Sequence, residues 1–317
     1  VGSEMCIRDS ACMFDTQGDA MKFFAVFLVV IAGTMWAGSG LAAQHFLAHN
    51  DHTAMDLTVF RMISTALIIF VIAFMRGTLG WSMRILKEYP TLWIKLVFYG
   101  LGLMLMQHTY FAGIGAGNAA VATVIQYICP ALVICWVALR RKKIPGMGDM
   151  FAVVLAVGGV FLLATGGNPR TLSVPAECIY YSVLSAVFYA FCSIYPKQLM
   201  MTLDNSFLLM FGMLFGGIMG YMADPVTDLG TFFHDDVLFD MFMIIICGTV
   251  IAFICYNAGL AWLTEEQASV TATVEPAVSV IASYFLFGTT FGLFEGTGII
   301  MVLLAILMPV MGKWHGN

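Results

Sequence analysis

Long apolar stretches alternate with short polar segments along almost the whole chain. From Lys22 onward the stretches last about 19–24 residues, enough for a helix to cross a hydrocarbon core roughly 30 Å thick. Lipid offers the backbone no hydrogen-bond partners, so such spans have to be helical. We therefore predict ten spans, over residues 23–43, 54–75, 91–114, 117–139, 147–165, 175–196, 205–223, 239–263, 267–288 and 291–312.

The composition agrees with this pattern. Hydrophobic residues make up 61% of the chain and charged residues 10%, whereas soluble domains have about 45–50% apolar and about 25% charged residues. A water-soluble fold could not bury so much apolar surface, so the lipid bilayer has to be the solvent for much of it. No basic tract indicates a nucleic-acid partner. The sequence predicts an all-α integral membrane protein.

Charges between the predicted spans indicate the orientation. The loop after the second span carries Arg76, Arg84 and Lys87, and the loop after the fourth carries Arg140-Arg141-Lys142-Lys143. With ten spans the opposite loops hold only Arg170 among basic residues, and the longest of them is acidic. Basic loops stay in the cytoplasm. We therefore expect a multi-pass protein of the cell inner (plasma) membrane with both termini cytoplasmic.

A weak internal repeat divides the chain. At a constant offset of 146 residues, the segment 110–114 (YFAGI) matches 256–260 (YNAGL), and Pro130-Ala131 matches Pro276-Ala277. Chance similarity between apolar helices is the alternative. Two units of five spans must insert with opposite orientations, because five is odd. We expect two inverted five-helix repeats, residues 21–168 and 169–317, with the solute site where the halves meet.

The N-terminal segment is treated separately. Met5-Cys6-Ile7-Arg8-Asp9-Ser10 resembles a translated sequencing adaptor, so we interpret residues 1–20 as a partly artefactual tail outside the fold.

The ordered motifs of both halves resemble the EamA family of the drug/metabolite transporter (DMT) superfamily. The resemblance rests on the duplicated unit, Trp36, Arg61, the Tyr-x-Ala-Gly segments and Glu275-Pro276, and it covers about residues 22–312. It implies a ten-helix carrier that exports amino acids or other metabolites. Family repeats commonly end the fourth and ninth helices with Gly-Glu, but this chain has basic residues in one place and Gly288-Thr289-Thr290 in the other. A non-transporting membrane receptor or scaffold with the same fold is therefore the alternative.

Two ionisable residues within spans are the main site candidates. Arg61 lies about 10 Å below one surface of the core and Glu275 about 14 Å below the other, at 1.5 Å per helical residue. Charges inside a membrane are costly and usually face protein or water, so both residues suggest function. A structural ion pair, a snorkelling arginine or a permanently protonated acid are the alternatives. Their depths differ by only about 6 Å on a core of about 30 Å, and we therefore hypothesise that Arg61 and Glu275 meet.

Weaker candidates complete the expected cavity. They are polar or aromatic residues within spans, each of which could equally serve ordinary helix packing. Pro276 should free the carbonyl of Ala272 and bend its helix beside Glu275. The substrate and coupling candidates besides Arg61 and Glu275 are Trp36, His108, Tyr110, Gln126, Tyr189 and Asn257. Thr123, Tyr127 and Pro130 share a face with Gln126.

Two further patterns carry less weight. Gly212, Gly216 and Gly220 predict close helix approach, inside the monomer or at a homodimer contact. His45, His49 and His52 have a spacing that can bind zinc, but they fall in an external loop, where histidines are usually solvated. We expect no metal and no cofactor.

These observations together predict a secondary active transporter rather than an enzyme, because no catalytic or nucleotide-binding motif is present among these residues. Its expected partners are a small-molecule solute, the bilayer and protons. We expect alternating access around a cavity between the halves.

Overall fold

The computed structural model describes the backbone of residues 2–142, 144–226 and 228–314, and the side chains of this part except those of residues 2–20, 265, 266, 269 and 308–314. The described chain is helical and has no strand. Its main helices are α1 (Gly2–His49), α2 (Ala54–Met75), α4 (Thr91–Ala116), α5 (Ala119–Gln126), α6 (Cys129–Arg141), α7 (Met147–Thr165), α8 (Ala176–Ile194), α10 (Asn205–Ala223), η2 (Phe242–Ile251), α12 (Ala252–Leu260), α13 (Glu265–Ala272), α14 (Val274–Phe287) and α15 (Leu293–Trp314). Short helices α9 (Lys197–Met200), η1 (Thr231–Phe233) and α11 (Leu238–Met241) join them.

The predicted spans coincide with these helices, and the first continues to His49. Within the described residues, eight helices are long and apolar enough to cross a membrane, and a bent pair would make nine. The last helix, α15, passes only as a shorter apolar helix over Leu293–Leu307. The protein is therefore an all-α, multi-pass membrane protein, and the count of ten spans stays a prediction.

One helix was not expected from the sequence. The basic loop after the second span contains α3 (Leu79–Glu88), which meets α4 at a bend of 117°. Leu86 and Ser82 are buried, whereas Trp81 on the same helix is 56% exposed. A short helix with an apolar and a basic side suits the plane of the membrane interface better than a crossing.

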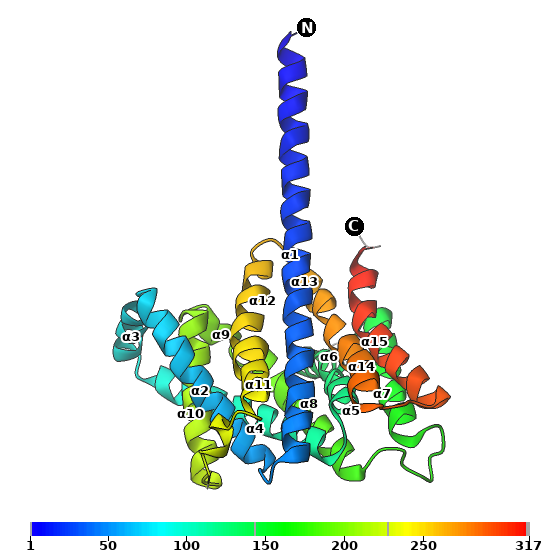
Figure 1. Cartoon of the computed structure of the whole chain (residues 1–317). Helices are drawn as coiled ribbons and strands as arrows, with labels where there is room; N and C mark the ends of the chain where they lie inside the picture. The colour runs from blue at the N-terminus through cyan, green and yellow to red at the C-terminus, as the bar shows by residue number, and fades with distance from the viewer. Residues whose placement is uncertain (1, 143, 227, 315–317) are drawn as a thin grey trace.

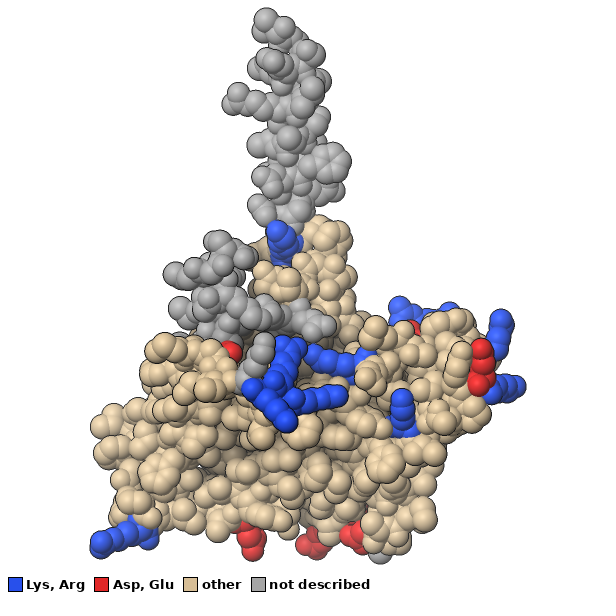
Figure 2. All heavy atoms as spheres, turned by 180° about the vertical axis from the view of Figure 1, so that it is seen from behind, with Lys and Arg blue, Asp and Glu red and all other residues tan. Residues whose placement is uncertain are grey.

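Helix α1 runs through the centre of the bundle, and both ends of the chain lie at one end of it (Figure 1). It packs against η2, α12 and α14 from the second half of the chain, while α2 packs against α10 and α7 against α15. Figure 2 shows most Lys and Arg side chains gathered at the end that carries the termini, and acidic side chains at the opposite end. The bundle therefore has the charge asymmetry that its loops predicted.

The glycines of α10 pack inside the monomer. A Cβ added at Gly212 would lie 2.8 Å from the Tyr99 ring, and one at Gly216 would lie 2.6 Å from the carbonyl oxygen of Gly100. Only glycine allows α10 and α4 to approach so closely. The first alternative for this motif, a contact within the monomer, is thus the one observed.

Two spans are interrupted beside a proline. The fourth span breaks between α5 and α6, one residue before Cys129-Pro130, and the ninth breaks at Thr273, just before Glu275-Pro276. The two prolines stand in the first turns of α6 and α14, where the missing N–H and fixed φ are tolerated. Gln126 and Glu275, which stand next to these two breaks, line the same cavity.

Candidate functional site

A cavity of about 140 Å³ lies among helices from both ends of the sequence. Arg61 and Glu275 are the only charged residues in its described lining. The lining residues are Trp36 and Ser39 on α1, Arg61 on α2, Leu103, Met106, Gln107 and Tyr110 on α4, Gln126 on α5, Tyr189 on α8, Met213 on α10, Phe253 on α12 and Glu275 on α14. The cavity is smaller than the roughly 300–1,000 Å³ pockets that hold drug-sized ligands, so it suits a small solute.

The π-helical segment η2 holds Arg61 in place. The Arg61 Nε donates to Thr249 Oγ1 at 3.2 Å, and a terminal nitrogen donates to the Gly248 carbonyl at 3.4 Å. Thr249 itself donates to the Ile244 carbonyl at 3.1 Å, five residues earlier in the π-helix. A guanidinium has five N–H groups, and these contacts use two of them. Because three N–H groups are left, Arg61 retains donors for an anionic group.

Glu275 is held by a tyrosine from the first half of the chain. The Tyr127 hydroxyl lies 2.8 Å from Glu275 Oε2 and 3.2 Å from the Ala272 carbonyl oxygen. The Ala272 carbonyl is the one that Pro276 leaves without a helical donor. A hydroxyl has a single proton, so Tyr127 can donate to only one of these oxygens at a time.

Hydrogen bonds between polar groups link α4, α5, α8 and α10 around the cavity. Gln126 Nε2 donates to Ser185 Oγ at 2.6 Å, and Ser185 donates to the Met106 carbonyl at 2.9 Å. Gln107 Nε2 donates to Met213 Sδ at 3.3 Å, whereas its buried Oε1 has no partner among the described residues. Buried acceptors are usually paired, so this oxygen is available to a donor in the cavity.

Aromatic side chains also line the cavity. The Trp36 ring packs edge-on against Phe253, with ring centroids 6.0 Å apart, and at a tilt against Tyr256 at 5.4 Å. The Tyr110 hydroxyl shares a hydrogen bond of 2.7 Å with Thr123. Such rings provide apolar contact area at fixed positions.

Six of the eight residues singled out from the sequence line this cavity: Trp36, Arg61, Tyr110, Gln126, Tyr189 and Glu275. Two do not. His108 faces another side of α4, beside Ala54 and Asp224, and Asn257 is exposed on α12. Sequence reasoning missed Ser39, Thr249 and the carbonyl of Gly248, since nothing in their local sequence distinguishes them from packing residues.

Arg61 and Glu275 share the cavity without touching. Glu275 lies within electrostatic range of Arg61, but the ion pairs among the described residues include none between them. The guanidinium carbon instead lies 5.4 Å from the centre of the Phe111 ring. Arg61 and Glu275 were expected to meet. They share a cavity but form no direct ion pair.

Aromatic rings packed around Phe232, which belongs to the loop connecting α10 and α11, form a buried cluster that we call the aromatic plug. Phe232, which is 1% exposed, stacks on Phe60 with ring centroids 4.1 Å apart and on Phe46 at 5.3 Å. It belongs to the same buried cluster as the cavity residue Tyr110. The cluster therefore extends from the cavity residue Tyr110 to the loop that connects α10 and α11.

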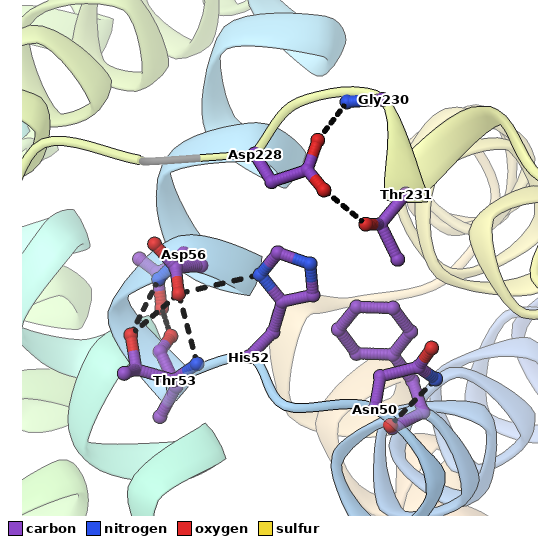
Figure 3. Close-up of polar contacts among 10 residues, drawn as sticks. Asn50, His52, Thr53, Asp56, Asp228, Gly230 and Thr231 are labelled. Atoms are coloured by element: carbon purple, nitrogen blue, oxygen red, sulfur yellow. Dashed lines mark hydrogen bonds and ion pairs between the residues drawn. The ribbon is translucent and has the colours of Figure 1, made fainter.

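Figure 3 shows polar contacts beside this plug, around His52. His52 faces Asp56, with Nδ1 and Oδ2 3.4 Å apart, and Asp56 also closes the capping box of α2 with Thr53. Hydrogen bonds from the Thr231 hydroxyl and the Gly230 N–H lower the pKa of the Asp228 carboxyl below its usual value.

The remaining histidines of this region also bond to neighbours. His45 lies 2.7 Å from Asp240 Oδ2, and His49 Nδ1 lies 2.8 Å from the His45 carbonyl oxygen. Among the described residues no three His, Cys, Asp or Glu side chains are grouped so that they could hold a metal ion.

Comparison with known proteins identifies the family. The EamA-like transporter family matches residues 23–165 and again residues 177–311. The chain is 29% identical over 282 residues to the "Uncharacterized inner membrane transporter YicL" of Salmonella typhimurium, covering 88% of this chain and 93% of that protein. It is 21% identical over 212 residues to an "Uncharacterized transporter" of Archaeoglobus fulgidus, covering 63% of this chain and 70% of that protein.

A solved crystal structure has the same fold, with a TM-score of 0.59 at 12% identity, over 95% of this chain and 99% of the other. The resemblance predicted from the ordered motifs of the two halves is confirmed. The chain belongs to the EamA-like transporter family.

Proposed function

We propose that the protein is a secondary active carrier that exports amino acids or related small metabolites by alternating access. One observation carries the proposal: the cavity has one cationic and one acidic side chain, contributed by different halves of the chain. An amino acid carries the complementary pair of charges. Its carboxylate would bind Arg61, and its ammonium group would bind Glu275 and the unpaired Oε1 of Gln107.

The movement proposed is a rocking of residues 21–168 against residues 169–317, as two inverted five-helix repeats. The breaks beside Pro130 and Pro276 support this, because they lie 146 residues apart, at the offset of the internal similarity. Discontinuous spans of this kind form solute sites in many inverted-repeat carriers. The aromatic plug around Phe232 would have to part when the cavity opens toward the acidic end.

Proton coupling is assigned to Glu275 and its tyrosine partner. When Glu275 is ionised, the Tyr127 proton is drawn to the carboxylate and the Ala272 carbonyl loses its donor. When Glu275 is protonated, the acid can donate to the Tyr127 oxygen, and the tyrosine proton turns to Ala272. Protonation would thus strengthen the contact between α5 and the break in the ninth span.

The proposed location is the inner membrane, where the name of the Salmonella relative places that protein. Both termini lie at the more basic end of the bundle (Figures 1 and 2). Basic segments stay in the cytoplasm, so the termini are proposed to be cytoplasmic.

A growth assay would identify the class of solute and test the role of Glu275. Cells that express the wild type, Glu275→Gln or Glu177→Gln would be challenged with a panel of toxic amino-acid analogues. Glu177 is an exposed acid in the first turn of α8 and serves as the matched control. We expect the wild type and Glu177→Gln to protect against one class of solute and Glu275→Gln to lose that protection.

Reconstituted protein separates the carrier from a receptor. Liposomes that contain the wild type should exchange labelled solute across the membrane. Binding of the solute without any flux would contradict the carrier proposal and favour a receptor that kept the fold.

A further inference from the structure

A second, larger hollow lies outside the proposed solute cavity. It has a volume of about 630 Å³ and shares no lining residue with that cavity. We call it the basic groove. Its lining residues are Lys95 on α4, Leu132, Cys135, Trp136, Leu139 and Arg140 on α6, Val187, Ala190, Phe191 and Ile194 on α8, Tyr195, and Gln198 and Leu199 on α9.

The walls of the basic groove are apolar and open. Trp136 is 54% exposed and Leu139 is 76% exposed. Phe191 and Tyr195 stack with ring centroids 4.8 Å apart and form part of the other wall. Apolar side chains left uncovered on a membrane protein are suited to contact with acyl chains, and Trp and Tyr are enriched at the level of the head groups.

The groove has two cations at one end. Lys95 is the fifth residue of α4, near its beginning, and Arg140 is in the last turn of α6. Successive spans run in opposite directions, so both side chains lie at the end of the bundle that carries the termini. Neither has an ion-pair partner among the described residues. Two unpaired cations above apolar walls complement an amphiphile with an anionic head group.

The second half of the chain offers an internal comparison. Ile281 and Phe285, which lie 146 residues after Cys135 and Leu139, line a hollow of about 440 Å³ at the end of α14. Its described lining contains no Lys or Arg. Helix α15 leads from this point back to the end of the bundle with the termini (Figure 1), so this hollow lies at the opposite end. The cations are therefore a feature of one groove and do not follow from the shape of the repeat.

We propose that the basic groove is a binding site for an anionic phospholipid of the leaflet next to the termini. The head-group phosphate would lie between Lys95 and Arg140, and one acyl chain would lie along Trp136 and Leu139. Basic pockets between membrane helices on the cytoplasmic side are a recurring form of lipid recognition. Two basic side chains near an anionic head group are together worth roughly 30-fold in affinity.

Fluorescence quenching of the full-length protein in detergent tests this site. The probes are phosphatidylglycerol and phosphatidylcholine with brominated acyl chains, which quench tryptophan on contact. We expect phosphatidylglycerol to quench at roughly 30-fold lower concentration than phosphatidylcholine. Trp136→Phe should remove the component that distinguishes the two lipids.

Charge variants give the decisive comparison. Lys95→Gln combined with Arg140→Gln should abolish the preference for phosphatidylglycerol. Arg84→Gln combined with Lys87→Gln removes the same charge from exposed positions of α3 and should keep it. Equal quenching by both lipids in the wild type would overturn the proposal, as would a preference that survives in the first double variant. The wild-type and Trp136→Phe data decide the matter even if a charge variant fails to fold.

Inorganic phosphate separates a lipid from a free anion. Added at the concentration of the lipid, it should leave the quenching by brominated phosphatidylglycerol unchanged. Displacement of the lipid by phosphate would show that the groove recognises the anion alone, and would overturn the lipid assignment.

Discussion

Replacement of Arg61 by glutamine tests how the proposed site recognises its solute. The guanidinium uses one N–H on Thr249 and one on the Gly248 carbonyl, which leaves three of five for a carboxylate. A hydrogen bond to a charged group contributes about 1.5–3 kcal/mol. One such contact therefore changes a dissociation constant by about 10–150-fold.

The fold should tolerate this substitution. Thr249 keeps its own acceptor, the Ile244 carbonyl at 3.1 Å. Arg61 has no ion-pair partner among the described residues, so its replacement leaves no acidic group there unpaired. A loss of binding in Arg61→Gln can therefore be separated from unfolding, which is checked by the melting temperature in detergent.

The assay compares an acid with its ester. For the solute class found in the growth panel, titration calorimetry would give the dissociation constants of the free acid and of its methyl ester. We expect the wild type to prefer the acid by about 10–150-fold and Arg61→Gln to bind both equally. Arg84→Gln, at an exposed position of α3, is the control and should retain the preference. A preference that is unchanged in folded Arg61→Gln would refute the assignment.

Three further predictions concern the proton site, the helix contact and the plug. Tyr127→Phe removes the hydrogen-bond partner of the buried Glu275 carboxyl and the Ala272 carbonyl, at a cost of about 1–3 kcal/mol in stability. The proton dependence of transport should flatten while solute exchange persists, and an unaltered proton dependence would argue against the proposed role of Tyr127. Gly216→Val places atoms where a Cβ already lies 2.6 Å from a carbonyl oxygen of α4, so thermal unfolding should show a loss of about 1–3 kcal/mol. Gly296→Ala, with nothing within 4 Å, should be neutral or stabilise by up to about 1 kcal/mol. Phe232→Ala should destabilise the folded protein by about 3–5 kcal/mol, because the Phe232 ring is 1% exposed. The neighbouring Phe233 is 66% exposed, so Phe233→Ala should have little effect. Similar melting temperatures for Phe232→Ala and Phe233→Ala would contradict the close packing of Phe232 in the plug.

Much of the membrane architecture was predictable because the bilayer constrains the sequence so strongly. Apolar stretches have to be long enough to cross it, and the stretches read from the sequence coincide with the helices. The same constraint singled out Arg61 and Glu275: a charge within a span has to face protein or water, and both residues line the proposed solute cavity. Pro276 also indicated correctly that the Ala272 carbonyl would need another donor.

Features that depend on rotation and packing of helices could not be predicted in this way. Gln107 and Tyr110, three positions apart, share a face of α4, but His108 next to Gln107 points elsewhere, because adjacent helical residues do not face the same way. Thr249 gains its contact with Arg61 from the π-helical turns of η2, which leave no mark in the hydropathy. Helix α3 escaped prediction because it is too short and too mixed in polarity to resemble a span.

Alternating access requires that the cavity can be reached from each side of the membrane in turn. Ser39 is a buried cavity residue that cysteine can replace with little change in volume. Ser39→Cys would be made in a chain whose eight cysteines are replaced, and a membrane-impermeant thiol reagent would be added to right-side-out and inverted vesicles. Ser173→Cys, at an exposed loop position, is the control and should react from one side only. We predict that the cysteine at position 39 reacts from both sides and that transported solute protects it. Reaction from a single side, with and without solute, would contradict alternating access.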